Sequence, residues 1–278
     1  MSIKQGVVTL VLGCGVVLFL LTTCRDLPIL FRSWAIQVQH PASYEFAKYD
    51  KLLHDFVDAD GLVDYSSLKK SGLLNLAVDE LATISPDKFP TREARLCYWI
   101  NAYNLLILKT ICDNYPVTSI RLLGNKPSLT KYIVASDIYS VKDVLETRLA
   151  GNFGDEPLAT FVVNGGAQGY PPLINHVIEP THLKADEQAN LYKFANDPRN
   201  SKYDDVTNRF SIAPYFQFYS DEYSVSFDSP HALVNSCMKK HINTGSVSMI
   251  CDYLPHFNWM LNDKALGIVD PEGQKLKR

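Results

Sequence analysis

Cysteine and histidine are the side chains of this sequence that could do covalent chemistry. Two of the six cysteines belong to an N-terminal apolar segment, and the remaining ones are Cys97, Cys112, Cys237 and Cys251. Cys237, Asp252 and His256 lie close together in the sequence and would supply a nucleophile, an acid and a base if the fold also gathers them. Packed cysteines and solvated or capping histidines are the simpler interpretation, because proximity in sequence does not establish proximity in space.

Common metal and catalytic signatures are absent from the sequence. No C-x-x-C, H-E-x-x-H or G-x-S-x-G motif occurs, which removes the usual zinc, redox and serine-hydrolase patterns. Residues 58–61 resemble the start of a calcium loop, but their glycine comes too early and Lys69 stands where the closing glutamate is needed. We therefore expect no metal and no cofactor. Cys237 and Cys251 could bridge a short loop in an oxidising compartment or remain free thiols.

A glycine-rich loop is the best place for a binding site. Residues 158–164 are an apolar run that predicts a buried strand, and a tight loop at 165–172 follows it. This loop has neither the G-x-x-x-x-G-K-[ST] nor the G-x-G-x-x-G spacing of phosphate-binding loops. Because loops at strand ends commonly display functional residues, we predict that Asn164, Gln168 and Tyr170 are binding residues.

The rest of the chain is organised around a long predicted helix at residues 91–113. Thr91 is its expected N-cap, and Pro116 follows its end because proline cannot continue a helix. Asn101 and Asn104 lie three residues apart and so share one face of the helix. Two interpretations stay open for this pair: the amides hold neighbouring loop backbone inside the fold, or they line a binding site.

Bulk composition excludes some classes of partner. The chain has 278 residues, of which 46% are hydrophobic, and a formal net charge of -3. Such a chain can bury a sizeable core. It has no basic excess of the kind that drives binding to a phosphate backbone, so we expect no nucleic-acid partner.

An uncharged run at residues 6–24 has about the length that spans a bilayer. We expect residues 1–26 to be an uncleaved anchor in the cytoplasmic (inner) membrane, followed by a connector at 27–43 and one globular domain at 44–278 outside the cytoplasm. A cleaved signal peptide with secretion, or a lipoprotein, is the alternative. Arg25 and Arg32 oppose this orientation, since positive charge prefers the cytoplasmic side. Trp34 is expected at the membrane interface or packed on the domain.

Hydrophobic periodicity and cap signals predict an α+β fold. It consists of an N-terminal helical part around the central helix and a small mixed sheet. Further helices are expected at 44–57, 66–84, 141–150, 184–196 and 229–241. Short strands are expected at 132–134, 138–139, 158–164, 210–213 and 247–253. The aromatic residues at 215–223 are expected to be mostly core, with a recognition surface as the alternative.

Six segments, in order, carry a resemblance to a known family. They are 60–65 (DGLVDY), 99–104 (WINAYN) with 115–121 (YPVTSIR), 171–173 (PPL), 194–199 (FANDPR), 216–223 (FQFYSDEY) and 253–262 (YLPHFNWMLN). Together they resemble the domain-of-unknown-function 547 family over residues 44–263. The family brings no settled activity. Its fold is similar to papain-like or transglutaminase-like thiol enzymes, in which a loop cysteine and an upstream histidine would be nucleophile and base.

This chain departs from the family at those very positions. Family members commonly read N-C-x-x-x-S-C-P-P-L at the loop, whereas here Gly165 and Tyr170 replace the cysteines and Gly169 replaces the serine. Upstream, Leu145 and Glu146 stand where a Glu-His pair is common. The resemblance therefore implies a site that has lost its thiol chemistry.

Two functions follow as hypotheses. The first is a membrane-anchored exported domain that binds a small ligand, a peptide or an envelope protein without catalysis, through Asn101, Asn104, Asn164, Gln168 and Tyr170. The second is a hydrolase or acyltransferase with a relocated nucleophile such as Cys237. A purely structural envelope protein is a third possibility.

Overall fold

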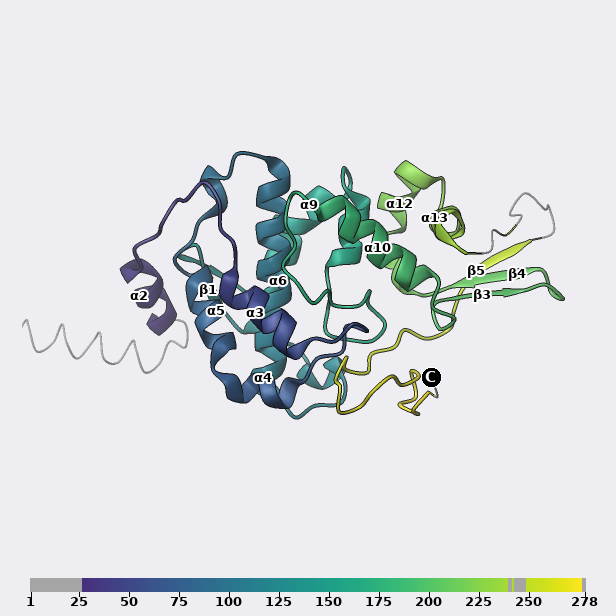
Figure 1. Cartoon of the computed structure of the whole chain (residues 1–278), viewed down its shortest axis with the longest axis horizontal. Helices are drawn as coiled ribbons and strands as arrows, with labels where there is room; N and C mark the ends of the chain where they lie inside the picture. The colour runs from purple at the N-terminus through teal and green to yellow at the C-terminus, as the bar shows by residue number, and fades with distance from the viewer. Residues whose placement is uncertain (1–26, 240–241, 243–248, 277–278) are drawn as a thin grey trace, which may run out of the picture.

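The computed structural model describes residues 27–239, 242 and 249–276 of the chain. The predicted membrane segment at residues 1–26 lies outside them. Figure 1 shows a long helix, α6, inside a bundle of helices, with a small sheet at the opposite end from helix α2. None of the helices in the described residues is long and apolar enough to cross a membrane.

The N-terminal part is helical, as expected, but more broken. The segment 27–43, expected as a connector, contains a helix, and its Gln39 backbone bonds to Thr83 and Ser85. The helical region predicted at 66–84 is present, but Gly72 adopts φ 71 and divides it into two helices. Glycine takes this left-handed conformation at no steric cost, so it ends one helix and starts the next. The helices are α2 (Leu27–Ala35), α3 (Ala47–Phe56), α4 (Tyr65–Ser71) and α5 (Leu73–Leu81).

Helix α6 (Arg92–Asn114) is the axis of the larger core. The Thr91 hydroxyl accepts a 3.0 Å hydrogen bond from the Ala94 amide, so the predicted N-cap is confirmed. Every residue from Leu96 to Cys112 except Lys109 is buried, so the burial extends to every face of the helix. A helix buried all round must lie in the middle of the fold, with other elements packed on each side.

In the segment between α6 and the glycine-rich loop, one predicted strand is wrong. Residues 157–162 form a 3₁₀ helix, η4 (Pro157–Val162), and not the predicted buried strand. The run is apolar because it is packed on α10 and enclosed by the core, and a short buried run has the same pattern in either conformation. The other elements are η1 (Pro86–Lys88), η2 (Ile120–Leu123), α7 (Lys126–Leu129), β1 (Tyr132–Val134), β2 (Asp137–Tyr139), α8 (Val141–Val144), the π-helical turn η3 (Leu145–Leu149) and α9 (Ala150–Phe153).

The C-terminal half builds a second core around a mixed sheet. Strand β4 pairs antiparallel with β3 and parallel with β5, which confirms the small mixed sheet. The expected aromatic core is present too, since Tyr215, Phe216 and Tyr223 are buried. The elements are α10 (Leu183–Ala195), β3 (Ser201–Asp204), β4 (Arg209–Ile212), α11 (Tyr215–Phe218), α12 (Ser220–Phe227), α13 (Pro230–Cys237) and β5 (Ile250–Tyr253). The described residues thus form a single α+β domain with two adjoining cores.

Candidate functional site

The glycine-rich loop lies against the segment that carries the closing family motif. The amides of Gln168 and Gly169 each donate a 2.8 Å hydrogen bond, to the carbonyls of Met260 and Asn258. The approach is close: a Cβ added at Gly169 would lie 2.8 Å from the Asn258 carbonyl oxygen. Glycine is therefore required here so that two backbone segments can meet.

Two asparagines form a relay from the central helix to this loop. Asn104 on α6 donates to the Val162 carbonyl (2.9 Å) and accepts from the Asn164 amide (2.9 Å). The Asn164 side chain then spans the loop, accepting from the Gly166 amide and donating to the Pro171 carbonyl, both at 2.7 Å. Because all of these groups are buried, the relay fixes the loop relative to the helix.

Asn101 holds a second loop segment, at Ile178, in the same way. Its side chain donates to the Ile178 carbonyl at 2.8 Å and accepts from the Ile178 amide at 3.0 Å. Both helix asparagines thus hold loop backbone, as one of the two interpretations of this pair expects. Asn101 also borders an apolar hollow of about 270 Å³ beside Cys97 and Phe46, away from the glycine-rich loop.

The two positions where family members carry cysteine lie side by side in this structure. The ring of Tyr170 rests on Gly165 so closely that a Cβ at Gly165 would lie 2.4 Å from a ring carbon. Tyr170 also makes edge-on ring contacts with Tyr215 and Phe257, at centroid separations of 5.7 and 5.2 Å. The two departures from the family pattern are therefore coupled, because the small residue at 165 makes room for the large one at 170.

Gln168 stands between two hollows. Its side-chain nitrogen donates to the carbonyls of Leu261 (3.0 Å) and Gly267 (2.8 Å), and its oxygen accepts from the Val269 amide (3.1 Å). On one side is a hollow of about 120 Å³, whose lining includes Asn164, Gln168 and Tyr170 together. On the other side is a larger cleft. The structure thus brings three of the predicted residues together at one small hollow.

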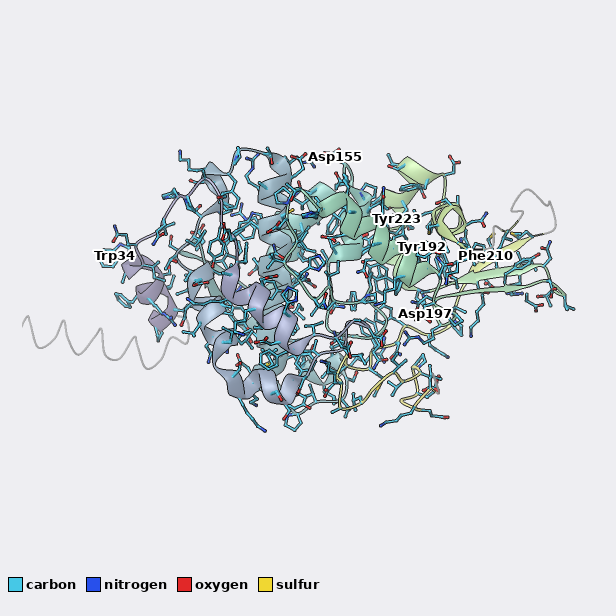
Figure 2. All side chains as sticks on the ribbon, in the orientation of Figure 1. Trp34, Asp155, Tyr192, Asp197, Phe210 and Tyr223 are labelled. Carbon is cyan, nitrogen blue, oxygen red and sulfur yellow. The ribbon has the colours of Figure 1, made fainter. Side chains whose placement is uncertain are left out.

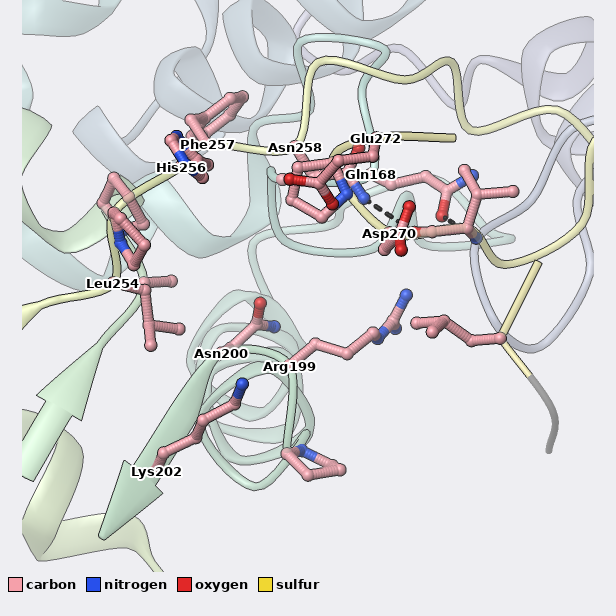
Figure 3. A pocket seen from close by; sticks show the side chains of 18 residues that line it. Gln168, Arg199, Asn200, Lys202, Leu254, His256, Phe257, Asn258, Asp270 and Glu272 are labelled. Carbon is pink, nitrogen blue, oxygen red and sulfur yellow. Dashed lines mark hydrogen bonds between the residues drawn. The ribbon is translucent and has the colours of Figure 1, made fainter. Parts of the chain in front are cut away.

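The larger cleft has a volume of about 340 Å³. Its floor includes Gln168 and Gly169, and its walls carry the apolar side chains of Leu254, Phe257 and Pro271. Figure 3 shows Arg199, Asn200 and Lys202 on one side of this cleft, with Asp270 and Glu272 on the opposite side and His256 near Phe257. The cleft therefore offers apolar walls between charges of opposite sign.

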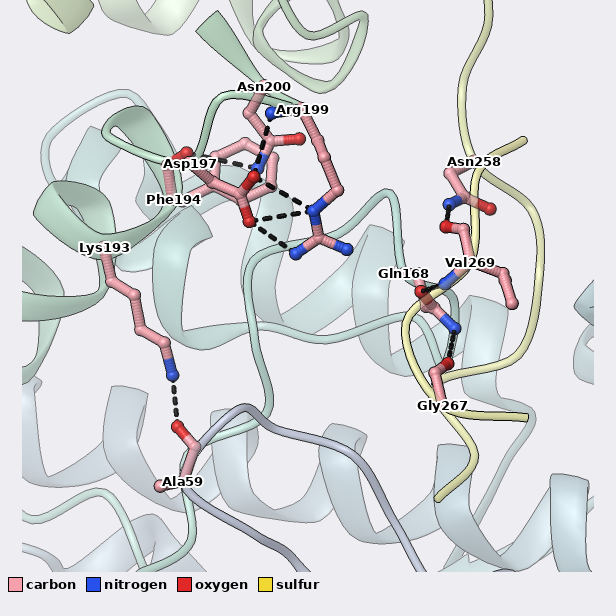
Figure 4. Close-up of polar contacts among 10 residues, drawn as sticks. All are labelled: Ala59, Gln168, Lys193, Phe194, Asp197, Arg199, Asn200, Asn258, Gly267 and Val269. Atoms are coloured by element: carbon pink, nitrogen blue, oxygen red, sulfur yellow. Dashed lines mark hydrogen bonds and ion pairs between the residues drawn. The ribbon is translucent and has the colours of Figure 1, made fainter. Parts of the chain in front are cut away.

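The basic side of the cleft is held in place by the turn after α10. Asp197 accepts two hydrogen bonds from the Nε of Arg199, at 2.9 and 3.0 Å, and a further one from its terminal nitrogen (Figure 4). This fork-like pairing fixes the guanidinium plane. Within α10 itself, Lys193 donates to the Ala59 carbonyl, which ties this helix to the N-terminal part of the chain.

The described thiols are poorly suited to nucleophilic chemistry. All four are free, and burial raises the pKa of Cys97 and Cys112 to about 12 and that of Cys237 to about 11. The pKa of exposed Cys251 is also raised, by partial burial and then by Asp252. The reactive form of cysteine is the thiolate, which sites of this kind disfavour.

The grouping of Cys237, Asp252 and His256 has no hydrogen-bonded connection in the described residues. The Asp252 carboxylate is bonded to Arg209 and Ser211, and these contacts keep its pKa low. The Cys237 thiol donates to backbone carbonyls of its own helix, at 3.1 and 3.5 Å. A catalytic triad would require hydrogen bonds between these three side chains, and the described residues show none.

Part of the chain matches a known protein family. Residues 86–194 match the family described as "Protein of unknown function, DUF547". This segment resembles the DUF547 family. No curated protein and no solved structure matches the chain. The resemblance to this family is therefore confirmed, over a matched range narrower than the 44–263 that the motifs suggested.

The geometry gives physical roles to the DUF547 motifs. The W-I-N-A-Y-N stretch supplies the two bracing asparagines, and the P-P-L stretch supplies the Pro171 carbonyl that Asn164 binds. The segment at 253–262 lies beyond the matched residues, yet it is the partner on which the loop rests.

Several cleft residues were not predicted from the sequence. They are Arg199, Asn200, Lys202, Asp270 and Glu272, whereas His256 was considered only as a catalytic base. A signal was present for Arg199, which ends the family-like F-A-N-D-P-R stretch, and for Asn200, which follows it. The C-terminal acids follow no motif. Within the described residues, no group of three His, Cys, Asp or Glu side chains is placed to hold a metal ion.

Proposed function

We propose that this chain is a membrane-anchored, exported domain that binds a ligand in its cleft without converting it. The observation that carries the proposal is the 340 Å³ cleft beside the braced glycine-rich loop. A concave site with mostly apolar walls and a few placed polar groups is the usual form of a ligand site. Attachment to the cytoplasmic membrane through residues 1–26 belongs to the proposal and rests on the uncharged run at 6–24.

The chemistry of the cleft favours a short, extended peptide segment as the ligand. Lys202 and Arg199 face Asp270 and Glu272 across apolar walls, so a ligand with an apolar centre and opposite charges at its two ends would complement both sides. The volume lies near the lower limit of ligand pockets, so it would enclose a few residues rather than a folded partner.

Non-catalytic binding is supported by what occupies the family's cysteine positions. If the fold is similar to papain-like or transglutaminase-like enzymes, the nucleophile position would be at this loop, where Tyr170 now covers Gly165. The Tyr170 ring, packed between Tyr215 and Phe257, occupies this position and supplies no thiol nucleophile. The raised pKa values of the four described thiols support the same assignment.

The test compares two charge reversals at exposed lysines. Lys202→Glu reverses a charge at the cleft, and Lys126→Glu makes the same change on α7, outside it. A fluorescent tetrapeptide pool with an acidic residue at one end and a basic one at the other is titrated with the full chain, and anisotropy is recorded. We expect about a tenfold or greater loss of affinity in Lys202→Glu alone, which corresponds to about 1.4 kcal/mol. Equal affinity in both variants would remove the cleft as the binding site.

A further inference from the structure

Helix α2 exposes an apolar face that the described residues do not cover. Leu30 is 50% exposed, Phe31 52% and Trp34 87%. Trp34 follows Leu30 by four residues and Phe31 by three, so the three side chains share one face of the helix. Isolated exposed apolar residues are ordinary, but three large apolar side chains on one helix face are not.

The opposite face fixes how α2 sits on the domain. The helix packs on the β1–β2 hairpin, with Ile29 and Ser33 half-buried. Arg32 forms an exposed ion pair with Asp79 of α5 at 2.8 Å. One turn before Asp79, Leu76 of α5 is 53% exposed and lies on the same side of that helix. The apolar face of α2 is therefore held outward, at the surface of the folded domain.

The sequence before α2 indicates what covers this face. The uncharged run at 6–24 ends three residues before Leu27, where α2 begins. If that run enters a bilayer, α2 must begin within about 10 Å of the end of the run, near the lipid headgroups, because three residues reach no further. Tryptophan is favoured at that depth, with its ring in the interface and its N–H towards water. Arg32 would lie at the level of the headgroup phosphates.

We propose that α2 is an interfacial helix whose Leu30, Phe31 and Trp34 insert into the membrane surface and set the orientation of the domain. This inference rests on the membrane attachment proposed above. Figure 1 shows α2 and the sheet towards opposite ends of the long axis, and Figure 2 shows Trp34 and Phe210 towards those same ends. A domain held by α2 therefore directs its sheet end, which borders the cleft through Lys202, away from the membrane.

The experiment uses the full chain in vesicles of equal parts phosphatidylcholine and phosphatidylglycerol. Part of the phosphatidylcholine carries brominated acyl chains, which quench tryptophan only at contact distance. Flotation first shows whether the chain is attached. Wild type is expected to lose most of its Trp34 emission in brominated vesicles. Trp34→Phe is expected to lose that quenched component, since Trp99 is buried and Trp259 is partly buried.

The matched control places a tryptophan at the other end of the molecule. Tyr203→Trp, made in the Trp34→Phe background, puts an exposed tryptophan on β3, and we expect no quenching by brominated lipid. A chain that does not float would overturn the proposed attachment and this inference with it. A chain that floats with Trp34 open to iodide and unquenched by lipid would overturn this inference alone. Trp34 shielded from both quenchers would show that protein covers the face, which would also overturn it.

Discussion

A buried glutamate should make this domain less stable as the pH rises. Glu187 on α10 is 0% exposed, and neither of its carboxyl oxygens has a hydrogen-bond partner among the described residues. The nearest cation is Lys184, whose Nζ lies 3.6 Å from Oε2 and whose side chain is 62% exposed. Burial raises the pKa of Glu187 from 4.5 to about 7, and the partial attraction of Lys184 does not cancel this.

The direction and the size of this change in folding stability with pH follow from proton linkage. The folded state holds the proton more tightly than the unfolded state, so the contribution of Glu187 is most favourable below the unfolded pKa of 4.5. Stability is lost as the pH rises through about 7, and little further is lost above that value. The separation of the two pKa values corresponds to roughly 3 kcal/mol.

Glu187→Gln removes this ionisation while keeping the shape of the side chain. We expect the variant to match wild type within about 1 kcal/mol at pH 5 and to be about 3 kcal/mol more stable at pH 8.5. Urea denaturation followed by tryptophan fluorescence measures both. Glu146→Gln, at an exposed position on η3, is the control and should change little at either pH. A stability difference between Glu187→Gln and wild type that does not change with pH would refute the reasoning.

Three further predictions concern the loop and the thiols. Gly165→Ala should cost about 1–3 kcal/mol in urea denaturation, because its Cβ meets the Tyr170 ring, and much less when Tyr170→Ala is already present. Asn104→Ala should cost about 2–4 kcal/mol, because it leaves two buried backbone groups unpaired. A thiol-reactive probe at pH 7.5 should label exposed Cys251 first and Cys97 only after unfolding, as read by mass spectrometry.

A specific result would contradict each of these three predictions. Strictly additive effects of the Gly165 and Tyr170 substitutions would show that the two side chains do not compete for space. Asn114→Ala is the control for Asn104, since the Asn114 amide bonds only within its own helix, to the Thr110 carbonyl. Equal losses in the two asparagine variants would disprove the relay. Fast labelling of Cys237 in the folded state would restore a thiol nucleophile to consideration.

Features set by local interactions were predictable from the sequence. Thr91 caps its helix as expected, because a cap depends on residues within one turn. The fold class and the hairpin of β1 and β2 followed from similar local patterns. The break at Gly72 was missed because the apolar spacing continues through it, although glycine was the available signal.

Features set by long-range contacts were not predictable. The run at 158–164 is buried by α10, and periodicity does not distinguish a buried strand from a buried helical turn. Gln168 and Tyr170 were correctly placed on the loop, but their contacts with Val269 and Phe257 come from about 90 to 100 residues further along the chain. The cleft itself joins Arg199 to Asp270, which share no motif.

The most direct test of non-catalytic binding in the cleft is whether the protein retains a ligand intact. The full chain is incubated with the tetrapeptide pool, separated by size exclusion, and the retained peptides are identified by mass spectrometry beside a Lys202→Glu sample. We predict that wild type retains intact peptides with opposite charges at their ends and that Lys202→Glu retains fewer of them. Cleaved peptides, or the same intact set retained by both proteins, would contradict a non-catalytic binding cleft at this position.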